Sequence, residues 1–231
     1  MSVVAIIPAR GGSKAIPRKN LVDLAGRPLF HWTIGAAQSS GVVDRLIVSS
    51  DDPEILESAE LAGAEAHHRP PALGADHVHA VHVVGDLLDA LRGRGEYPDT
   101  VLMLLPTSPF RRAEHIAEAV KLLEREDPPS VISVTELDKQ LIHLRTIDPV
   151  GNLEPFLPWH QLTAQRQEQP PLYALNGSVY AARPASLQAA GTFHVPGARA
   201  IVMDARSSVD INEPSDLEWA RYLAAQEVPV S

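Results

Sequence analysis

Short apolar runs alternate with amphipathic segments along most of the chain. The apolar runs, which predict buried strands, lie at 3–7, 46–49, 101–105 and 131–134. Apolar residues recur at helical spacing between them, over about 29–38, 54–62, 81–91 and 113–124. This rhythm is typical of an α/β fold in which helices flank a mostly parallel sheet. Ligands of such sheets bind at the carboxyl ends of the strands, so we expect the functional site there.

Two helix starts carry local signals. Asp52 stands directly before Pro53, and this pair predicts a helix N-cap followed by proline in the first turn. Pro214 is expected to open the last helix, over about 213–226, in the same way.

The alternating rhythm breaks between 136 and 171. This segment contains Asp148-Pro149-Val150-Gly151-Asn152, which predicts a turn, and then the proline-spaced LEPFLPWH. We expect extended, β-rich arms joined by tight turns. Strand-like runs resume at 176–182 and 200–203. The sequence therefore predicts one domain over 1–231, from which 136–171 projects as an arm.

The composition narrows the class of protein. The 231 residues carry a formal net charge of −9, which argues against a general binder of nucleic acid or of anionic membranes. There is no cysteine, so disulfides, zinc-thiolate sites and thiol catalysis are excluded. No apolar run approaches the roughly 18 residues of a membrane span. We expect a cytoplasmic protein.

Positive charge is concentrated after the first apolar run. The segment from 9 to 20, called here the opening loop, carries four cations and no acid: Arg10, Lys14, Arg18 and Lys19. Gly11 and Gly12 let backbone N–H groups approach a ligand closely. This pattern favours a cradle for a polyphosphate over an ordinary connection with exposed cations. The spacing matches neither the P-loop nor the dinucleotide-binding GxGxxG.

Several segments together resemble one family. PARGGSKAIPRKN is similar to the ARGGSKGIPRKN motif of acylneuraminate cytidylyltransferases. Further similar segments are LIVSSDDPEI, HRPPALGAD, LLPTSPFRRAEHI, RQEQPPLYALNGSVYAAR and SSVDINEPSDLEWA, so the resemblance runs nearly end to end. The resemblance implies a nucleotide-diphosphosugar-transferase-like fold, CTP, a divalent cation such as Mg²⁺, and a homodimer built by the arm.

The resemblance also implies a set of nucleotide-binding residues. They are Ala9, Arg10, Gly11, Gly12, Ser13, Lys14, Lys19, Asn20 and Arg69. Lys14 is the residue expected to stabilise charge on the reacting phosphate, together with Arg10. For Arg18 and Lys19, solvated charges after Pro17 are an equally good interpretation.

For the metal, the resemblance points to Asp210 and Asn212 and implies two acids at these positions. Here the second is an amide, which can still coordinate Mg²⁺ but removes one negative charge. Because apolar residues flank Asp210, we expect it at a strand end, aimed at the cradle. The alternative is a cap for the helix that begins near 213.

The acceptor site is where the chain departs from its resemblance. Leu105 stands where the family has a glutamine, whereas Arg166 and Asn176 match its acceptor-binding positions. Hydrogen-bonding groups discriminate strongly between substrates, so this change can redirect acceptor choice. His79 and His82 are expected to lie on a helix surface or contact substrate rather than bind metal.

The predicted activity is therefore CTP-dependent, Mg²⁺-assisted transfer of CMP to a small acidic acceptor, with release of pyrophosphate. A sialic-type nonulosonic acid is the acceptor implied by the resemblance, and a phosphonate is the alternative. Two further hypotheses stay open: a nucleotide-binding module whose catalysis is weakened by Asn212, and a transferase that uses another nucleotide.

Overall fold

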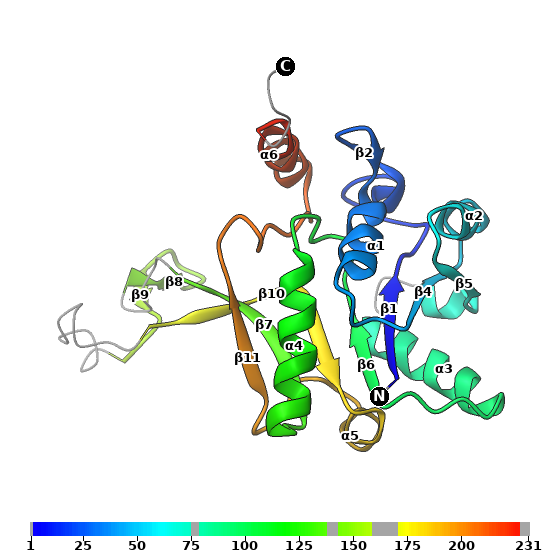
Figure 1. Cartoon of the computed structure of the whole chain (residues 1–231). Coiled ribbons are helices and arrows are strands. Elements are labelled where there is room, and N and C mark those ends of the chain that lie inside the picture. Colours follow the sequence, from blue (N-terminus) through cyan, green and yellow to red (C-terminus); the bar gives the residue numbers. More distant parts are fainter. Residues whose placement is uncertain (1, 75–78, 138–142, 159–170, 227–231) are drawn as a thin grey trace.

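A seven-stranded sheet forms the centre of the computed structural model, which describes residues 2–74, 79–137, 143–158 and 171–226 (Figure 1). The strands run in the order β11-β7-β10-β6-β1-β4-β5. Their bounds are β1 Val3–Pro8, β4 Arg45–Ser50, β5 Glu65–His68, β6 Thr100–Met103, β7 Ser130–Glu136, β10 Tyr173–Ala182 and β11 Arg199–Met203. Only β10 among these pairs antiparallel with its neighbours, so the expected mostly parallel sheet is confirmed.

Helices cover both faces of this sheet. Their bounds are α1 Leu29–Ser39, α2 Pro53–Leu61, α3 Ala80–Gly93, α4 Ala113–Glu126, α5 Pro184–Ala190 and α6 Pro214–Ala225. Side chains of β1 alternate between the two layers, because successive residues of a strand point to opposite faces. Ala5 and Ile7 belong to the core formed with α1, α2 and α4, and Val4 and Ile6 to the core formed with α3 and α5.

The predicted strands and helices are found close to their expected positions. The carboxylate of Asp52 accepts a hydrogen bond from the Glu54 N–H at 2.9 Å, which confirms the predicted N-cap. Pro214 begins α6 as expected. Three features were not predicted: the short edge strand β5, the seven-residue α5, and a small hairpin of β2 Asp23–Leu24 and β3 Arg27–Pro28.

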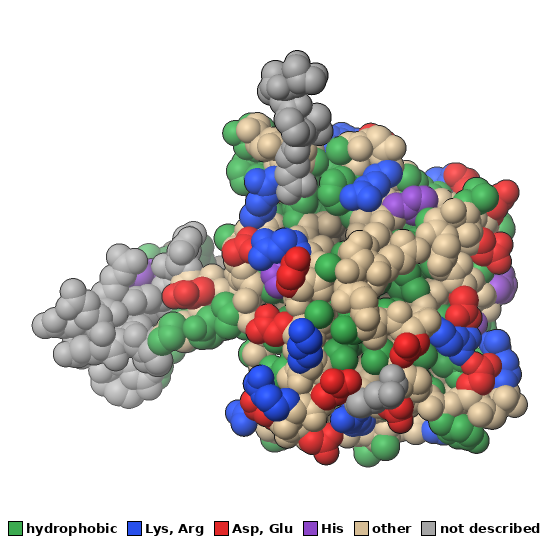
Figure 2. Space-filling model, in the orientation of Figure 1, with side chains coloured by type: hydrophobic (Ala, Val, Ile, Leu, Met, Phe, Trp, Pro, Cys, Tyr) green, Lys and Arg blue, Asp and Glu red, His purple; other side chains and the backbone are tan. Residues whose placement is uncertain are grey.

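The arm leaves the sheet between β7 and β10 and projects from the body of the molecule (Figures 1 and 2). Its described part contains an antiparallel hairpin of β8 Arg145–Ile147 and β9 Leu153–Pro155. Asp148 Oδ1 accepts hydrogen bonds from the N–H groups of Val150 and Asn152, which confirms the predicted turn. Ile147, Leu153 and Phe156 are all more than half exposed, so the arm presents apolar surface to solvent.

A third, smaller core joins the two ends of the chain. Ile16, Leu24 and Leu29 from the N-terminal part pack in one cluster with Ile211 and Leu217 from the C-terminal part. This packing holds the segment before α6 beside the opening loop. No helix in the described part of the chain is long and apolar enough to cross a membrane.

Candidate functional site

Strand β1 delivers the opening loop to the carboxyl edge of the sheet, and backbone contacts fix it there. The Ala9 N–H donates to the carbonyl of Ser49 at 2.9 Å, and the Gly11 N–H donates to Asp51 Oδ1 at 3.2 Å. A Cβ at Gly11 would lie 2.7 Å from the Cβ of Asp52. Glycine is therefore required at 11 by close packing against the N-cap of α2.

The two cations left open by the sequence point in different directions. Arg18 is exposed and pairs with Glu54 at 2.7 Å and with Asp52 at 3.2 Å. Lys19 is partly buried, and its Nζ donates to the carbonyl of Ile211 at 2.8 Å. Burial lowers the pKa of Lys19, which the nearby carboxylate of Asp210 opposes. Arg18 is thus a surface ion pair, whereas Lys19 turns inward.

Lys19 lines a cavity of about 290 Å³ at the carboxyl ends of β1 and β6, called here the first cavity. Its lining residues are Pro8, Arg10, Lys19, Asn20, Arg69, Leu73, Ala80, Val83, Leu105, Pro106, Thr107, Asp210 and Asn212. Seven residues predicted for the site from sequence are thereby brought together. Three basic residues, Arg10, Lys19 and Arg69, and a single acidic residue, Asp210, are among them.

Three polar atoms of this lining, one each on Asn20, Arg69 and Asp210, are buried without a hydrogen-bond partner in the described part of the chain. Asn20 donates through its Nδ2 to the carbonyl of Arg10 at 2.8 Å, but its Oδ1 is unpaired. Arg69 donates through Nη2 to Asp51 at 3.1 Å, while its Nε is unpaired. Burial lowers the pKa of Arg69, and the contact with Asp51 opposes this. An unpaired buried acceptor and donor are costly unless a ligand satisfies them.

The acid wall of the cavity comes from residues 204–212, called here the acid loop, which connects β11 to α6. Asp210 does not lie at a strand end as expected, because β11 ends at Met203 and residues 209–212 form no regular structure. Asp210 does not cap the last helix either. Glu213 is the N-cap of α6, and Asp216 accepts from the N–H groups of Asn212 and Glu213.

The geometry of Asp210 and Asn212 fits a hard divalent cation. Asp210 Oδ1 is buried and has no hydrogen-bond partner, while its Oδ2 accepts from Asn212 Nδ2 at 2.7 Å. A carboxylate oxygen and an amide oxygen are suitable donors for Mg²⁺. Among the described residues, no group of three or more His, Cys, Asp or Glu could hold a metal. Ligand oxygens would therefore have to complete the coordination.

A buried arginine, Arg111, contacts the segment that carries the lining residue Leu105. Arg111 is 3% exposed and donates to the carbonyl of Leu105 at 2.6 Å, the carbonyl of Ser178 at 2.8 Å and the hydroxyl of Thr33 at 3.1 Å. Burial lowers the pKa of Arg111 to about 9, and the charge of Asp210 opposes that shift. Arg111 thus ties β10 and α1 to the segment that carries Leu105.

A second cavity, of about 430 Å³, adjoins the first at Ala80 and Leu105, which line both. Its remaining lining is His79, Val81, His82, Met103, Tyr180, Gly191, Thr192, Phe193 and His194. The rings of His79 and His82 lie 6.2 Å apart, and Tyr180 contacts His194 edge to face. The lining of the second cavity therefore combines apolar side chains with titratable groups, which are three histidines and Tyr180.

Other residues predicted for the site lie outside the first cavity. Ala9, Gly11, Gly12, Ser13 and Lys14 flank it without lining it, and the Lys14 side chain is exposed. Asn176 is buried, with its amide hydrogen-bonded inside the protein rather than open to an acceptor. Arg166 lies outside the described residues.

Sequence reasoning missed Arg111 and Thr107, although both stand in the segment LLPTSPFRRAEHI. The carbonyl of Thr107 accepts from the Ile211 N–H at 2.8 Å and so ties this segment to the acid loop. The available sequence signal was Arg111, a basic residue that directly follows the apolar Phe110. Tyr180 and His194 had no signal, because their roles depend on how β10 and the segment after α5 fold together.

Comparison with known proteins shows which family this sequence belongs to. Residues 4–175 match the family described as Cytidylyltransferase. A CMP-N,N'-diacetyllegionaminic acid synthase of Legionella pneumophila is 36% identical over 95% of this chain and 94% of its own length. An N-acylneuraminate cytidylyltransferase of Escherichia coli is 33% identical over 94% of this chain, which spans only 51% of that longer protein.

A solved structure is similar in fold. CMP:2-keto-3-deoxy-manno-octonic acid synthetase, in complex with CTP, matches 99% of this chain and 100% of its own with a TM-score of 0.74 at 18% identity. This confirms the expected nucleotide-diphosphosugar-transferase-like fold. The chain belongs to the cytidylyltransferase family, on its acylneuraminate-like branch, and is a nucleotidyltransferase.

Proposed function

We propose that this enzyme transfers a cytidylyl group from CTP to a nonulosonic acid of the sialic type and releases pyrophosphate. The observation that carries the proposal is the first cavity, which Arg10, Lys19, Arg69 and Asp210 line together and which shares Ala80 and Leu105 with a second cavity. The relatives named for legionaminic and acylneuraminic acids support this acceptor class.

CTP fits the first cavity by charge and by hydrogen bonding. Its triphosphate lies along Arg10 and Lys19, where cations neutralise phosphate oxygens, and Lys14 reaches it from the rim. The unpaired Arg69 Nε donates to a carbonyl oxygen of the nucleotide, and the unpaired Asn20 Oδ1 accepts from one of its N–H or O–H groups. Binding thus satisfies two buried atoms that have no partner among the described residues.

Asp210 and Asn212 would hold a Mg²⁺ ion together with phosphate oxygens. The donor set suits this ion, because Mg²⁺ is commonly bound through one or two carboxylates plus substrate phosphates. The ion would supply neutralisation of the charge on the triphosphate.

The acceptor occupies the second cavity, next to the α-phosphate. An acceptor oxygen attacks the α-phosphorus in line, a new P–O bond forms, and the bond to the bridging oxygen breaks as pyrophosphate leaves. The acceptor hydroxyl gives up its proton to water. The chain's own residues position the reactants and neutralise charge, which is the main task of catalysis in phosphoryl transfer.

A phosphonate acceptor is the second candidate, favoured by one observation. Leu105 presents an apolar side chain at the junction of the two cavities, where a sialic-type acid has polar groups to satisfy. An acceptor that is small and already ionised loses less at such a position than a polyhydroxylated sugar acid.

The test is pyrophosphate release from CTP with a panel of legionaminic, pseudaminic, sialic and phosphonic acids. We expect turnover with a nonulosonic acid and with CTP in preference to UTP, GTP and ATP. Turnover only with a phosphonate selects the second candidate. Thermal stabilisation by CTP without pyrophosphate release from any acid would instead make the chain a nucleotide-binding module.

We also propose that the arm pairs with a second copy of the chain. Ile147, Val150 and Leu153 are between 63% and 82% exposed, although large apolar side chains are more favourable when buried. A dimer in equilibrium sedimentation that becomes a monomer in an Ile147→Lys, Leu153→Lys variant supports this assembly. A wild-type monomer contradicts it.

A further inference from the structure

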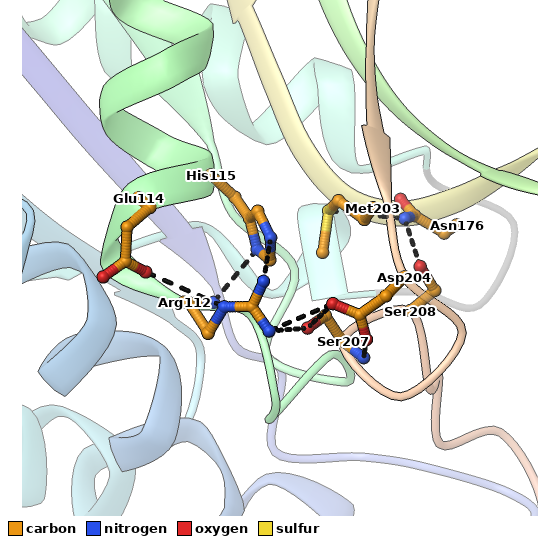
Figure 3. A network of polar contacts seen from close by, with 8 residues as sticks. All are labelled: Arg112, Glu114, His115, Asn176, Met203, Asp204, Ser207 and Ser208. Atoms are coloured by element: carbon orange, nitrogen blue, oxygen red, sulfur yellow. Dashed lines mark hydrogen bonds and ion pairs between the residues drawn. The ribbon is translucent and has the colours of Figure 1, made fainter.

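Residues 204–208 of the acid loop make two separate sets of side-chain contacts with other segments, drawn together in Figure 3. The outer contact joins Arg112, at the start of α4, to Asp204 and Ser207. The inner contact joins Asn176, in β10, to Ser208. The two hydroxyls are neighbours in sequence but bind different parts of the protein, which makes their contributions separable.

The outer contact is redundant. Arg112 Nη1 donates to Asp204 Oδ2 and to Ser207 Oγ, each at 3.0 Å. The Ser207 N–H also donates to Asp204 Oδ1 at 2.8 Å. Removing the Ser207 hydroxyl therefore leaves both the ion pair of Arg112 with Asp204 and the backbone turn of residues 204–207.

In the inner contact, both the oxygen and the nitrogen of the Asn176 side-chain amide are hydrogen-bonded. Asn176 is 5% exposed, and its Oδ1 accepts from Ser133 Oγ at 2.6 Å and from the Ser178 N–H at 3.2 Å. Its Nδ2 donates to Ser208 Oγ at 2.9 Å and approaches Met203 Sδ at 3.4 Å. These contacts fix the amide in one orientation, so that its donor is presented to the acid loop.

The residue after Asn176 brings β10 up against the site. Gly177 has a φ of +70°, a backbone conformation that strongly favours glycine, at an irregularity in the pairing of β10 with β7. A Cβ there would lie 3.4 Å from Leu105 and 4.0 Å from Asp210 Oδ2. The Asn-Gly pair thus lies directly behind the carboxylate of the first cavity.

We propose that Asn176 is a positioning residue, which fixes the Asp210 carboxylate through its hydrogen bond to Ser208. The inference rests on the proposed function and deepens it, because it assigns Asn176 to the acid side of the site instead of to acceptor binding. Ser208 lies two residues before Asp210, and in the described part of the chain the hydroxyl of Ser208 makes no other hydrogen bond. Groups that orient a metal ligand from behind commonly change metal affinity about 10–100-fold when removed.

The decisive comparison is between Ser208→Ala and its neighbour Ser207→Ala. Mn²⁺ binding to the CTP complex is measured by electron paramagnetic resonance, without acceptor. We expect the Mn²⁺ dissociation constant to rise about tenfold in Ser208→Ala and to stay within about twofold of wild type in Ser207→Ala. The affinity for CTP without metal, measured in EDTA, should change in neither variant, because Arg10, Lys19 and Arg69 are unaltered. Equal Mn²⁺ affinities in Ser208→Ala and wild type would overturn the proposal.

Two further variants separate positioning from loss of stability. Ser208→Thr keeps a hydroxyl and should restore Mn²⁺ affinity, whereas Asn176→Ala should weaken it at least as much as Ser208→Ala. A Ser208→Thr protein as weak as Ser208→Ala would contradict the hydrogen-bond argument.

A crystal structure of Ser208→Ala decides the inference independently of CTP. We expect the Asp210 carboxylate to be displaced relative to Lys19, and an unchanged position would overturn the proposal. If the wild-type enzyme does not bind CTP, the proposed function is wrong, but the comparison of the two crystal structures still tests whether Ser208 positions Asp210.

Discussion

The opening loop and the acid loop face each other across the first cavity, but they are built in different ways. The opening loop follows directly from a buried strand, and its cations and glycines stand within twelve residues of sequence. The acid loop is held by side chains from β10, α4 and the opening loop itself. The cationic side of the site is therefore encoded locally, whereas the acid side depends on the folded protein.

The largest expected effect lies where the two loops touch. Lys19→Met keeps the aliphatic stem but removes the ammonium that faces the cavity and holds the Ile211 carbonyl. We expect kcat/KM to fall by about 10²–10³-fold, comparable to the loss of one preorganised donor at a charge-developing centre. Steady-state pyrophosphate release measures this, with Lys121→Met on the exposed face of α4 as the matched control. Wild-type kinetics for Lys19→Met would remove Lys19 from the site.

The fold was predictable to the extent that local patterns determine it. The run at 3–7 became β1 and the proline after Asp52 marked the start of α2, because strand burial and helix capping act over a few residues. The strand β5 was missed, since EAHH is short, polar and at the sheet edge.

The site was predictable on its cation side and only in part on its acid side. Arg10, Lys19 and Asn20 line the first cavity, and their binding of a nucleotide stays a prediction. Asp210 was expected at a strand end, but its place depends on packing of Ile211 and on hydrogen bonds from distant segments. The hydrogen bonds of Asn176 could not be predicted, because its partners Ser133 and Ser208 lie 43 and 32 residues away in sequence.

Lys14 tests whether the exposed rim of the opening loop takes part. Lys14→Ala should lower turnover by about a hundredfold, because in the proposed function Lys14 contacts the triphosphate, and it should leave the fold intact, because the side chain is exposed. Turnover and thermal melting are measured together, with Arg18→Ala as the control, since Arg18 pairs outward with Glu54. If both variants behave alike, the rim has no role in charge stabilisation.

The rigidity of the opening loop is tested at its glycines. Gly11→Ala places a Cβ 2.7 Å from the Asp52 side chain, whereas a Cβ at Gly12 meets nothing within 4 Å. Gly11→Ala should therefore lower the free energy of unfolding by about 1–3 kcal/mol, as overpacking does, and Gly12→Ala should change it far less. Urea denaturation measures both. Equal losses would mean that the loop is not held against α2.

The charge of the acid loop is tested by Asn212→Asp, which adds a carboxylate beside Asp210. We expect the Mg²⁺ concentration for half-maximal activity to fall about tenfold, because a second anionic oxygen binds this ion more strongly than an amide. Titration of activity with Mg²⁺ measures it. An unchanged requirement places Asn212 outside the coordination of the ion.

The smallest effect concerns pH. Burial lowers the pKa of Lys19, so this lysine loses its proton at a lower pH than an exposed one. The KM for CTP should therefore rise a few-fold on the alkaline side, as pH increases through that lowered pKa, and Lys19→Arg should abolish the rise. Initial rates between pH 7 and 10 measure it, and the same alkaline rise in both proteins would assign it to another group.

A crystal structure with CTP and Mg²⁺, without acceptor, tests most directly whether the two loops act on one nucleotide. We expect the triphosphate between Lys19 and Asp210, with Arg69 and Asn20 contacting the nucleoside. Electron density for CTP elsewhere on the protein, with this cavity empty, would contradict the account.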